Sequence, residues 1–145
     1  TTPLAVQKTV EVMDGLFPGC VKGIDENMLL VKAEALPEVA RYLKESPELE
    51  FDYLNCISGV DYFDYLEVVY HLTSLRHNHS LVMKVRCHEV ENASVPSVVN
   101  IWQGADFQER EVFDLVGVSF PGHPNLKRIF LWDGFQGNPL RKNFF

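Results

Sequence analysis

Two segments in which every second residue is apolar constrain the fold of this chain more than any other feature. In residues 66–72 and again in residues 81–87, every second side chain is apolar, which is the period of a strand with one buried face. The polar connector 73–79 is short enough for a hairpin. We therefore expect two strands that share one apolar face. The residues of that face are Leu66, Val68, Tyr70, Leu72, Leu81, Met83, Val85 and Cys87.

The N-terminal part predicts a helix followed by a hairpin. Thr2 can cap a helix, Pro3 suits its first turn, and apolar residues recur at helical spacing until Pro18-Gly19. The apolar runs 20–24 and 28–32, separated by polar residues, then fit two paired strands. The apolar positions of the predicted helix are Val6, Val10, Met13 and Phe17.

A second helix and a further strand are expected before the alternating pair. Leu36-Pro37-Glu38 begins the helix and Ser46-Pro47 ends it. The mixed segment 51–60 is interpreted as a strand, with Gly59 at a bulge or bend. Strands and helices in this arrangement predict an α+β domain with a mixed or antiparallel sheet flanked by helices.

Helical spacing returns after Pro96. Apolar residues in 98–102 and the segment 106–116 predict helix, and Gly117 is the expected stop. Asp106, followed three residues later by Glu109, resembles a capping box.

Composition limits the classes of protein to consider. A chain of 145 residues with 46% hydrophobic residues can bury a core without disulfides or a structural metal. Its net charge of −7 argues against a general attraction to nucleic acid or anionic lipid. No apolar stretch approaches the ~20 residues that cross a bilayer, and Thr1–Leu4 does not begin a signal peptide. We expect a soluble, cytoplasmic and unprocessed chain.

Cysteine and histidine spacing predicts no metal centre. The three cysteines, Cys20, Cys56 and Cys87, lie more than thirty positions apart, and we expect them to be small buried hydrophobes in a reducing compartment. His77 and His79 could bind a metal together with His71 and His88 of the adjoining strands, but a polar turn needs no further reason for these residues and is the favoured interpretation.

Residues 117–145 differ in character from the rest. They are rich in glycine, proline and aromatic residues, and they carry a charge of +3 against −10 for residues 1–116. We expect an α+β domain over 1–116 and an extended, irregular C-terminal arm over 117–145. Composition leaves open whether the arm binds a partner or wraps its own domain.

The densest charged cluster lies on the last predicted helix. Glu111 and Asp114 are three residues apart and Arg110 and Asp114 four apart, so both pairs are neighbours on a helix. We expect Glu109, Arg110, Glu111 and Asp114 to form structural ion pairs, although a buried carboxylate of this set could serve acid/base chemistry. His123, held between Pro121 and Pro124, suits a docking turn or a catalytic imidazole.

This region resembles the thirty-kilodalton-type (C-type) subunit family of NADH:quinone oxidoreductase, which is respiratory complex I. The likeness covers roughly residues 51–142. It is carried by 109–116, His123, 127–130 and 133–142, and also by 58–62 and 67–72.

The resemblance implies a cofactor-free, structural subunit in the hydrophilic arm of a membrane-bound redox complex. NADH, quinone, flavin and iron–sulfur clusters would belong to the assembly, and the partners would be the large quinone-site subunit and the iron–sulfur subunits. It also implies a peripheral position on the cytoplasmic side of the cell membrane. The expected partner contacts are His123, Lys127, Arg128, Phe130, Trp132, Arg141 and Lys142. The competing hypothesis is a stand-alone small-molecule enzyme that uses His123 with Glu109 or Glu111.

Overall fold

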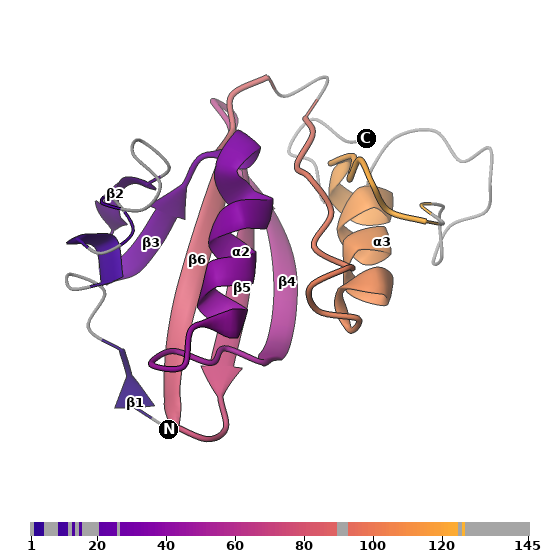
Figure 1. Ribbon diagram of the computed structural model, residues 1–145. Helices are drawn as coiled ribbons and strands as arrows, with labels where there is room; N and C mark the ends of the chain where they lie inside the picture. Colours follow the sequence, from indigo (N-terminus) through magenta and orange to yellow (C-terminus); the bar gives the residue numbers. More distant parts are fainter. Residues whose placement is uncertain are drawn as a thin grey trace.

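A six-stranded mixed sheet forms the centre of the fold in the computed structural model (Figure 1). Five strands lie in the order β2-β3-β6-β5-β4, and β1 pairs with β6 off this path. The pairs β2/β3, β5/β6 and β4/β5 are antiparallel, whereas β3 and β1 run parallel to β6. The strands are β1 Thr2–Pro3, β2 Val21–Asp25, β3 Met28–Val31, β4 Tyr53–Asp61, β5 Leu66–Ser74 and β6 His79–Cys87. The structure describes residues 2–4, 9–11, 13, 15, 21–25, 27–89, 93–124 and 126.

The alternating segments form the β5–β6 hairpin, as predicted. Leu72 pairs with Leu81, Tyr70 with Met83 and Val68 with Val85. All eight residues of the predicted apolar face are buried.

Two α-helices and one short 3-10 helix are described completely. The 3-10 helix η1 spans Ala33–Ala35 and leads into α2, Leu36–Glu45, which lies across the sheet in Figure 1. Helix α2 begins with proline in its first turn and buries Leu36, Val39, Ala40 and Leu43, as its apolar spacing predicts. Helix α3, Ala105–Val116, packs against β4 and ends at Gly117, whose φ of 90° suits a glycine stop. None of the described helices is long and apolar enough to cross a membrane.

The start of the chain differs from the prediction. Thr2 and Pro3 form β1, which pairs with His79 and Ser80 of β6, and Leu4 N–H donates to Ser80 O at 2.8 Å. Proline lacks an N–H but is tolerated at a sheet edge, so pairing with β6 replaced the expected helix start. Residues 9–11, 13 and 15 are helical, with Met13 fully buried, whereas Val6 and Phe17 lie outside the described residues.

The prediction of a helix over 98–102 is also wrong. This segment makes one turn, in which the N–H groups of Ile101 and Trp102 both donate to Val98 O at 2.9 Å. The indole N–H of Trp102 donates to Phe51 O at 2.8 Å, and this contact fixes the turn against the segment just before β4. Helix α3 begins after Gly104 without a side-chain cap, so Asp106 and Glu109 do not form the predicted capping box.

Strand β4 corrects two further predictions. Its bulge lies between Leu54 and Cys56, while Gly59 pairs regularly with Val68. The extra residue turns Cys56 outward, so this cysteine is exposed rather than buried. Cys87 is buried as expected, and Cys20 lies outside the described residues.

The two histidines at the β5–β6 turn hydrogen-bond to backbone carbonyl oxygens. The Nε2 atoms of His77 and His79 lie 2.8 and 3.0 Å from the carbonyl oxygens of Pro47 and Leu49. Because a carbonyl only accepts, each Nε2 carries the donated hydrogen. These contacts tie the turn to the segment after α2, and the described residues contain no group of three or more potential metal ligands.

Candidate functional site at the start of helix α3

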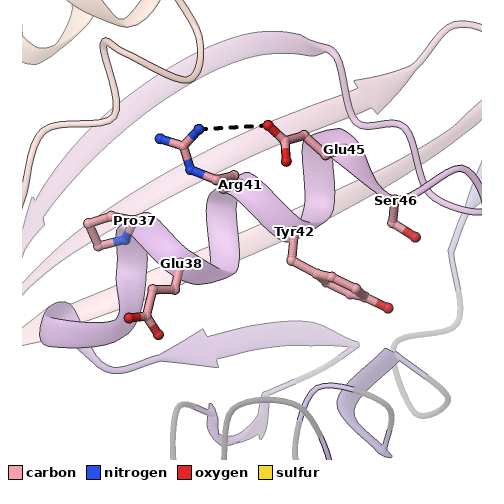
Figure 2. A pocket seen from close by; sticks show the side chains of 6 residues that line it. All are labelled: Pro37, Glu38, Arg41, Tyr42, Glu45 and Ser46. Atoms are coloured by element: carbon pink, nitrogen blue, oxygen red, sulfur yellow. Dashed lines mark ion pairs between the residues drawn. The ribbon is translucent and has the colours of Figure 1, made fainter.

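One open hollow lies along the outer side of α2 (Figure 2). It measures about 480 Å³ and is lined by Pro37, Glu38, Arg41, Tyr42, Glu45 and Ser46. Arg41 and Glu45 form an ion pair across 3.7 Å, but both side chains are more than half exposed. Such a pair is weak in water, and none of the candidate site residues lines the hollow.

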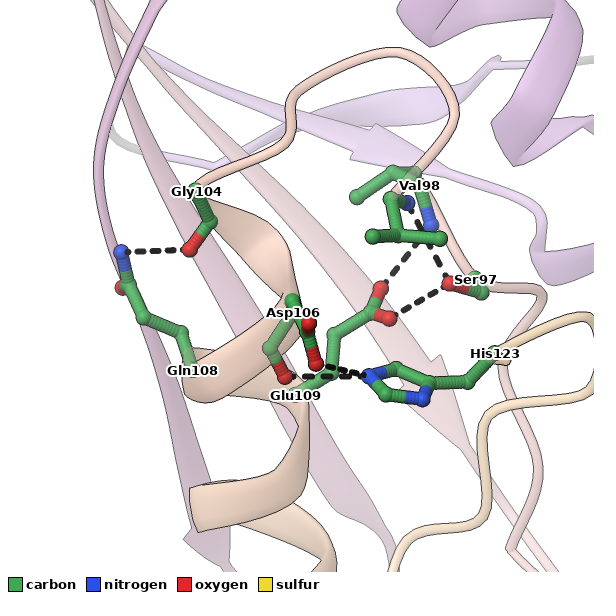
Figure 3. Close-up of polar contacts among 8 residues, drawn as sticks. Ser97, Val98, Gly104, Asp106, Gln108, Glu109 and His123 are labelled. Carbon is green, nitrogen blue, oxygen red and sulfur yellow. Dashed lines mark hydrogen bonds and ion pairs between the residues drawn. The ribbon is translucent and has the colours of Figure 1, made fainter. Parts of the chain in front are cut away.

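Three of the candidates, Asp106, Glu109 and His123, come together instead at the start of α3 (Figure 3). The segment before α3 runs beside the segment after it: Val95 N–H donates to Ser119 O at 2.9 Å and Ser97 N–H to Pro121 O at 2.8 Å. This pairing brings Ser97 and His123 to the same helix, where Glu109 and Asp106 contact them.

Glu109 is the centre of this cluster and is fully buried. Its Oε1 accepts a hydrogen bond from Ser97 Oγ at 2.5 Å, and its Oε2 accepts one from Val98 N–H at 2.9 Å. A buried carboxylate needs such donors because it has lost its hydration. The Glu109 side chain therefore fixes the segment before α3 to the helix.

Burial raises the pKa of the Glu109 carboxyl above its ordinary value. The hydrogen bonds from Ser97 and Val98 and the nearby His123 oppose this shift, whereas the negative charge of Asp106 adds to it. Loss of hydration is the largest of these effects, so the neutral form is favoured relative to a Glu in water.

His123 points into its own chain. Its Nε2 lies 3.0 Å from both the carbonyl oxygen and Oδ1 of Asp106, and its side chain has no exposed surface. Gly122, with φ of 92°, makes the turn before it, and His123 N–H donates to Phe120 O at 3.1 Å. Because a backbone carbonyl only accepts, Nε2 is a hydrogen donor here.

The other members of the predicted ion-pair cluster occupy the same helix at different depths. Asp114 is fully buried, whereas Arg110 and Glu111 are half-buried. Ion pairing among Glu109, Arg110, Glu111 and Asp114 stays a prediction. Burial of two of these four charged side chains was not foreseen, because the sequence favours a charged surface here.

Six of the expected partner contacts lie outside the described residues. They are Lys127, Arg128, Phe130, Trp132, Arg141 and Lys142. Of the contact candidates, only His123 is described, and it contacts Asp106 of its own chain.

Three further residues of this region were not predicted as site residues. Ser97 and the Val98 amide donate hydrogen bonds to Glu109, and nothing in the sequence predicted a contact between this segment and Glu109. Tyr70 is the third: its phenol is fully buried, and Oη has no hydrogen-bond partner among the described residues. Burial raises the pKa of Tyr70, and the negative charges of Glu109 and Cys87 add to the effect.

The polar contacts of this cluster hold the segments before and after α3 to the helix, which suits a structural role better than a catalytic one. The Glu109 oxygens accept from Ser97 and Val98, and His123 Nε2 is committed to Asp106. General acid/base catalysis needs a carboxyl or imidazole within reach of a substrate proton. Here the side chains of Glu109 and His123 have no exposed surface.

Comparison with known families decides what kind of chain this is. The model of the family described as "Respiratory-chain NADH dehydrogenase, 30 Kd subunit" matches residues 29–145. The chain belongs to this family. The family assignment agrees with the resemblance found in the sequence and does not support the stand-alone enzyme that would use His123 with Glu109 or Glu111.

Individual relatives carry names of the same kind. A C-type subunit of NADH-quinone oxidoreductase from Rhizobium meliloti (strain 1021) is 44% identical over 137 residues, which cover 90% of this chain and 74% of the relative. The corresponding C-type subunit from Roseiflexus castenholzii is 44% identical over 116 residues, covering 78% of this chain and 66% of the relative.

A solved structure supports the fold of this member of the 30 kDa family. A chain in the structure of the membrane-bound sulfane sulfur reductase, an archaeal respiratory membrane complex, aligns with a TM-score of 0.76 at 26% identity. The alignment covers 96% of this chain and 85% of that chain.

Proposed function

We propose that this chain is a peripheral-arm subunit of an NADH:quinone oxidoreductase, complex I, which couples electron transfer from NADH to quinone to proton translocation. The family match over residues 29–145 is the observation that carries the proposal. The names of the relatives and the respiratory membrane complex among the solved structures support it.

The role of the chain within the assembly is structural. The polar cluster supports this role, because Glu109 holds Ser97 and Val98 while His123 holds Asp106, all within one chain. A rigid scaffold contributes to rate by positioning its neighbours. NADH, quinone, flavin and iron–sulfur clusters belong to other subunits in this proposal, and the isolated chain catalyses no turnover.

The proposed partners are the large quinone-site subunit and the iron–sulfur subunits of the hydrophilic arm. The chain would lie on the cytoplasmic side of the membrane and reach the membrane only through the complex. Its net charge of −7 gives it no general affinity for nucleic acid or anionic lipid.

The basic arm over 117–145 is the proposed contact region. Val118 and Phe120 at its beginning are buried in the core, so the arm starts as part of the domain. The positive charges that follow, at Lys127, Arg128, Arg141 and Lys142, suit acidic patches on neighbouring subunits.

The role of the arm is tested by reversing charges in it while the rest of the chain is kept unchanged. A tagged Arg141→Glu/Lys142→Glu variant is purified from its native membranes beside the wild type, and co-purified subunits are quantified by mass spectrometry. Arg41→Glu is the control, because Arg41 is exposed on α2. We expect the arm variant to lose its partners while Arg41→Glu keeps them. Equal recovery with all three chains would contradict the role of the arm.

A further inference from the structure

The turn that joins β4 to β5 presents aromatic side chains to the solvent. Tyr62 is 46% exposed and Phe63 is 69% exposed. The ring of Tyr65 lies 5.2 Å from that of Tyr62 and 5.5 Å from that of His88, and the Arg86 guanidinium lies 5.0 Å from the Tyr65 ring centre. We call residues 62–65 the aromatic turn.

Hydrogen bonds hold the aromatic turn in one conformation. Asp61 Oδ1 accepts from Phe63 N–H at 2.8 Å, and Tyr62 N–H donates to Tyr65 O at 3.0 Å. Phe63 has a φ of 71°, in the left-handed region that bulky residues avoid. Asparagine would adopt this conformation more easily, so folding does not explain an exposed phenylalanine at this position.

Near the aromatic turn the cationic side chains are paired, whereas two carboxylates are exposed. Arg86 Nε lies 2.9 Å from Glu67 Oε2, and Lys84 Nζ lies 3.5 Å from Glu67 Oε1. Both cations are thus engaged by a carboxylate that is only 2% exposed. The carboxylates of Asp64 and Glu89, in contrast, are exposed. The rim of the aromatic turn therefore offers negative charge.

We propose that the aromatic turn docks into an apolar protein pocket rimmed by Lys or Arg on a neighbouring subunit of the assembly. Buried aromatic residues are the common centres of protein interfaces, and the exposed acidic rim complements a basic one. The same rim repels anionic lipid. This inference rests on the proposed function, since it names a surface through which the chain would join that assembly.

The test replaces Phe63 by asparagine in the tagged full-length chain. Phe63→Asn removes the ring and suits the left-handed backbone, so the isolated variant should melt no lower than the wild type. Recovery of partner subunits from native membranes should fall by about tenfold or more, as for loss of an interface anchor. Leu75→Asn is the matched control, because Leu75 is 68% exposed in the turn between β5 and β6. This control should keep full recovery.

The charge of the proposed pocket has its own test. Asp64→Lys should weaken recovery of partner subunits, and a photo-reactive phenylalanine analogue at position 63 should cross-link to a segment of a neighbouring subunit that contains Lys or Arg. The analogue at position 75 should give no such product. A cross-link from position 63 only to its own chain would overturn the proposal.

The remaining outcomes separate the two proposals. If wild type and Phe63→Asn recover the partners equally, docking through the aromatic turn is wrong and the proposed function stands. If the wild type recovers no partner subunits, both docking through the aromatic turn and the proposed function are wrong. Self-association of the wild type in sedimentation that Phe63→Asn abolishes would identify a second copy as occupant. Binding to vesicles of anionic lipid lost in the same variant would identify a membrane surface, and either result would overturn the proposal.

Discussion

The Ser97 hydroxyl donates a hydrogen bond to Glu109 Oε1 over 2.5 Å and joins the segment before α3 to a carboxylate with no exposed surface. Glu109→Ala removes the acceptor for Ser97 and for the Val98 amide and leaves both donors unpaired. We expect a loss of about 1–3 kcal/mol in the free energy of unfolding. Glu109→Gln keeps an acceptor and should lose less, as urea titration at neutral pH would measure. Equal losses in the two variants would contradict the role of these hydrogen bonds.

Stability should depend on pH through the same residue. Because the folded state raises the pKa of Glu109, it holds the proton more tightly than the unfolded chain, whose Glu pKa is about 4.3. The proton contributes stability below that value, and this contribution is lost as pH rises through the higher folded pKa.

The measurement compares unfolding free energies of wild type and Glu109→Gln between pH 4 and pH 8. The stability of the wild type relative to the variant should decline as pH rises and then level off, since the variant cannot titrate at position 109. A relative stability that increases with pH would show that the pKa of Glu109 is lowered instead.

Gly59 lies where β4 and α3 approach each other closely. A Cβ at residue 59 would stand 2.9 Å from Val112 Cγ1 and 3.0 Å from Val116 Cγ2. Gly59→Ala should therefore cost about 1–3 kcal/mol through overpacking. Gly104→Ala is the control, because a Cβ there meets nothing within 4 Å. Thermal melting of both variants measures the difference, and equal melting temperatures would be inconsistent with the close approach.

Tyr70 carries a buried hydroxyl that has no hydrogen-bond partner among the described residues. Tyr70→Phe removes this group and keeps the ring, so the variant should be as stable as the wild type or more stable by about 1 kcal/mol. Urea unfolding of the wild type and of Tyr70→Phe measures the difference in the free energy of unfolding. A loss above about 1 kcal/mol would mean that the hydroxyl is hydrogen-bonded in solution.

The sequence predicted those parts of the fold that depend on local periodicity. Alternation placed β5 and β6, and proline with helical spacing placed α2, because a half-buried strand or helix repeats its pattern over several residues. Features set by distant contacts were missed. Trp102 bonds to Phe51, 51 residues away, and that contact forms a turn where periodicity favoured a helix.

The site was predicted only in part for the same reason. Glu109, Asp114 and His123 were named, but the burial of Glu109 and His123 depends on how the segments before and after α3 pair. Gly59 was assigned to a bulge or bend, since sequence alone does not distinguish an irregular strand from a close helix contact. The apolar face of β5 and β6 needed no such long-range information.

The measurement that tests the central claim most directly is purification of the tagged full-length chain from its native membranes at moderate salt, followed by mass spectrometry and an NADH-to-quinone assay. We predict that the large quinone-site subunit and the iron–sulfur subunits co-purify with activity, while the isolated chain has none. Recovery of the chain alone, or turnover by the chain alone, would contradict the account.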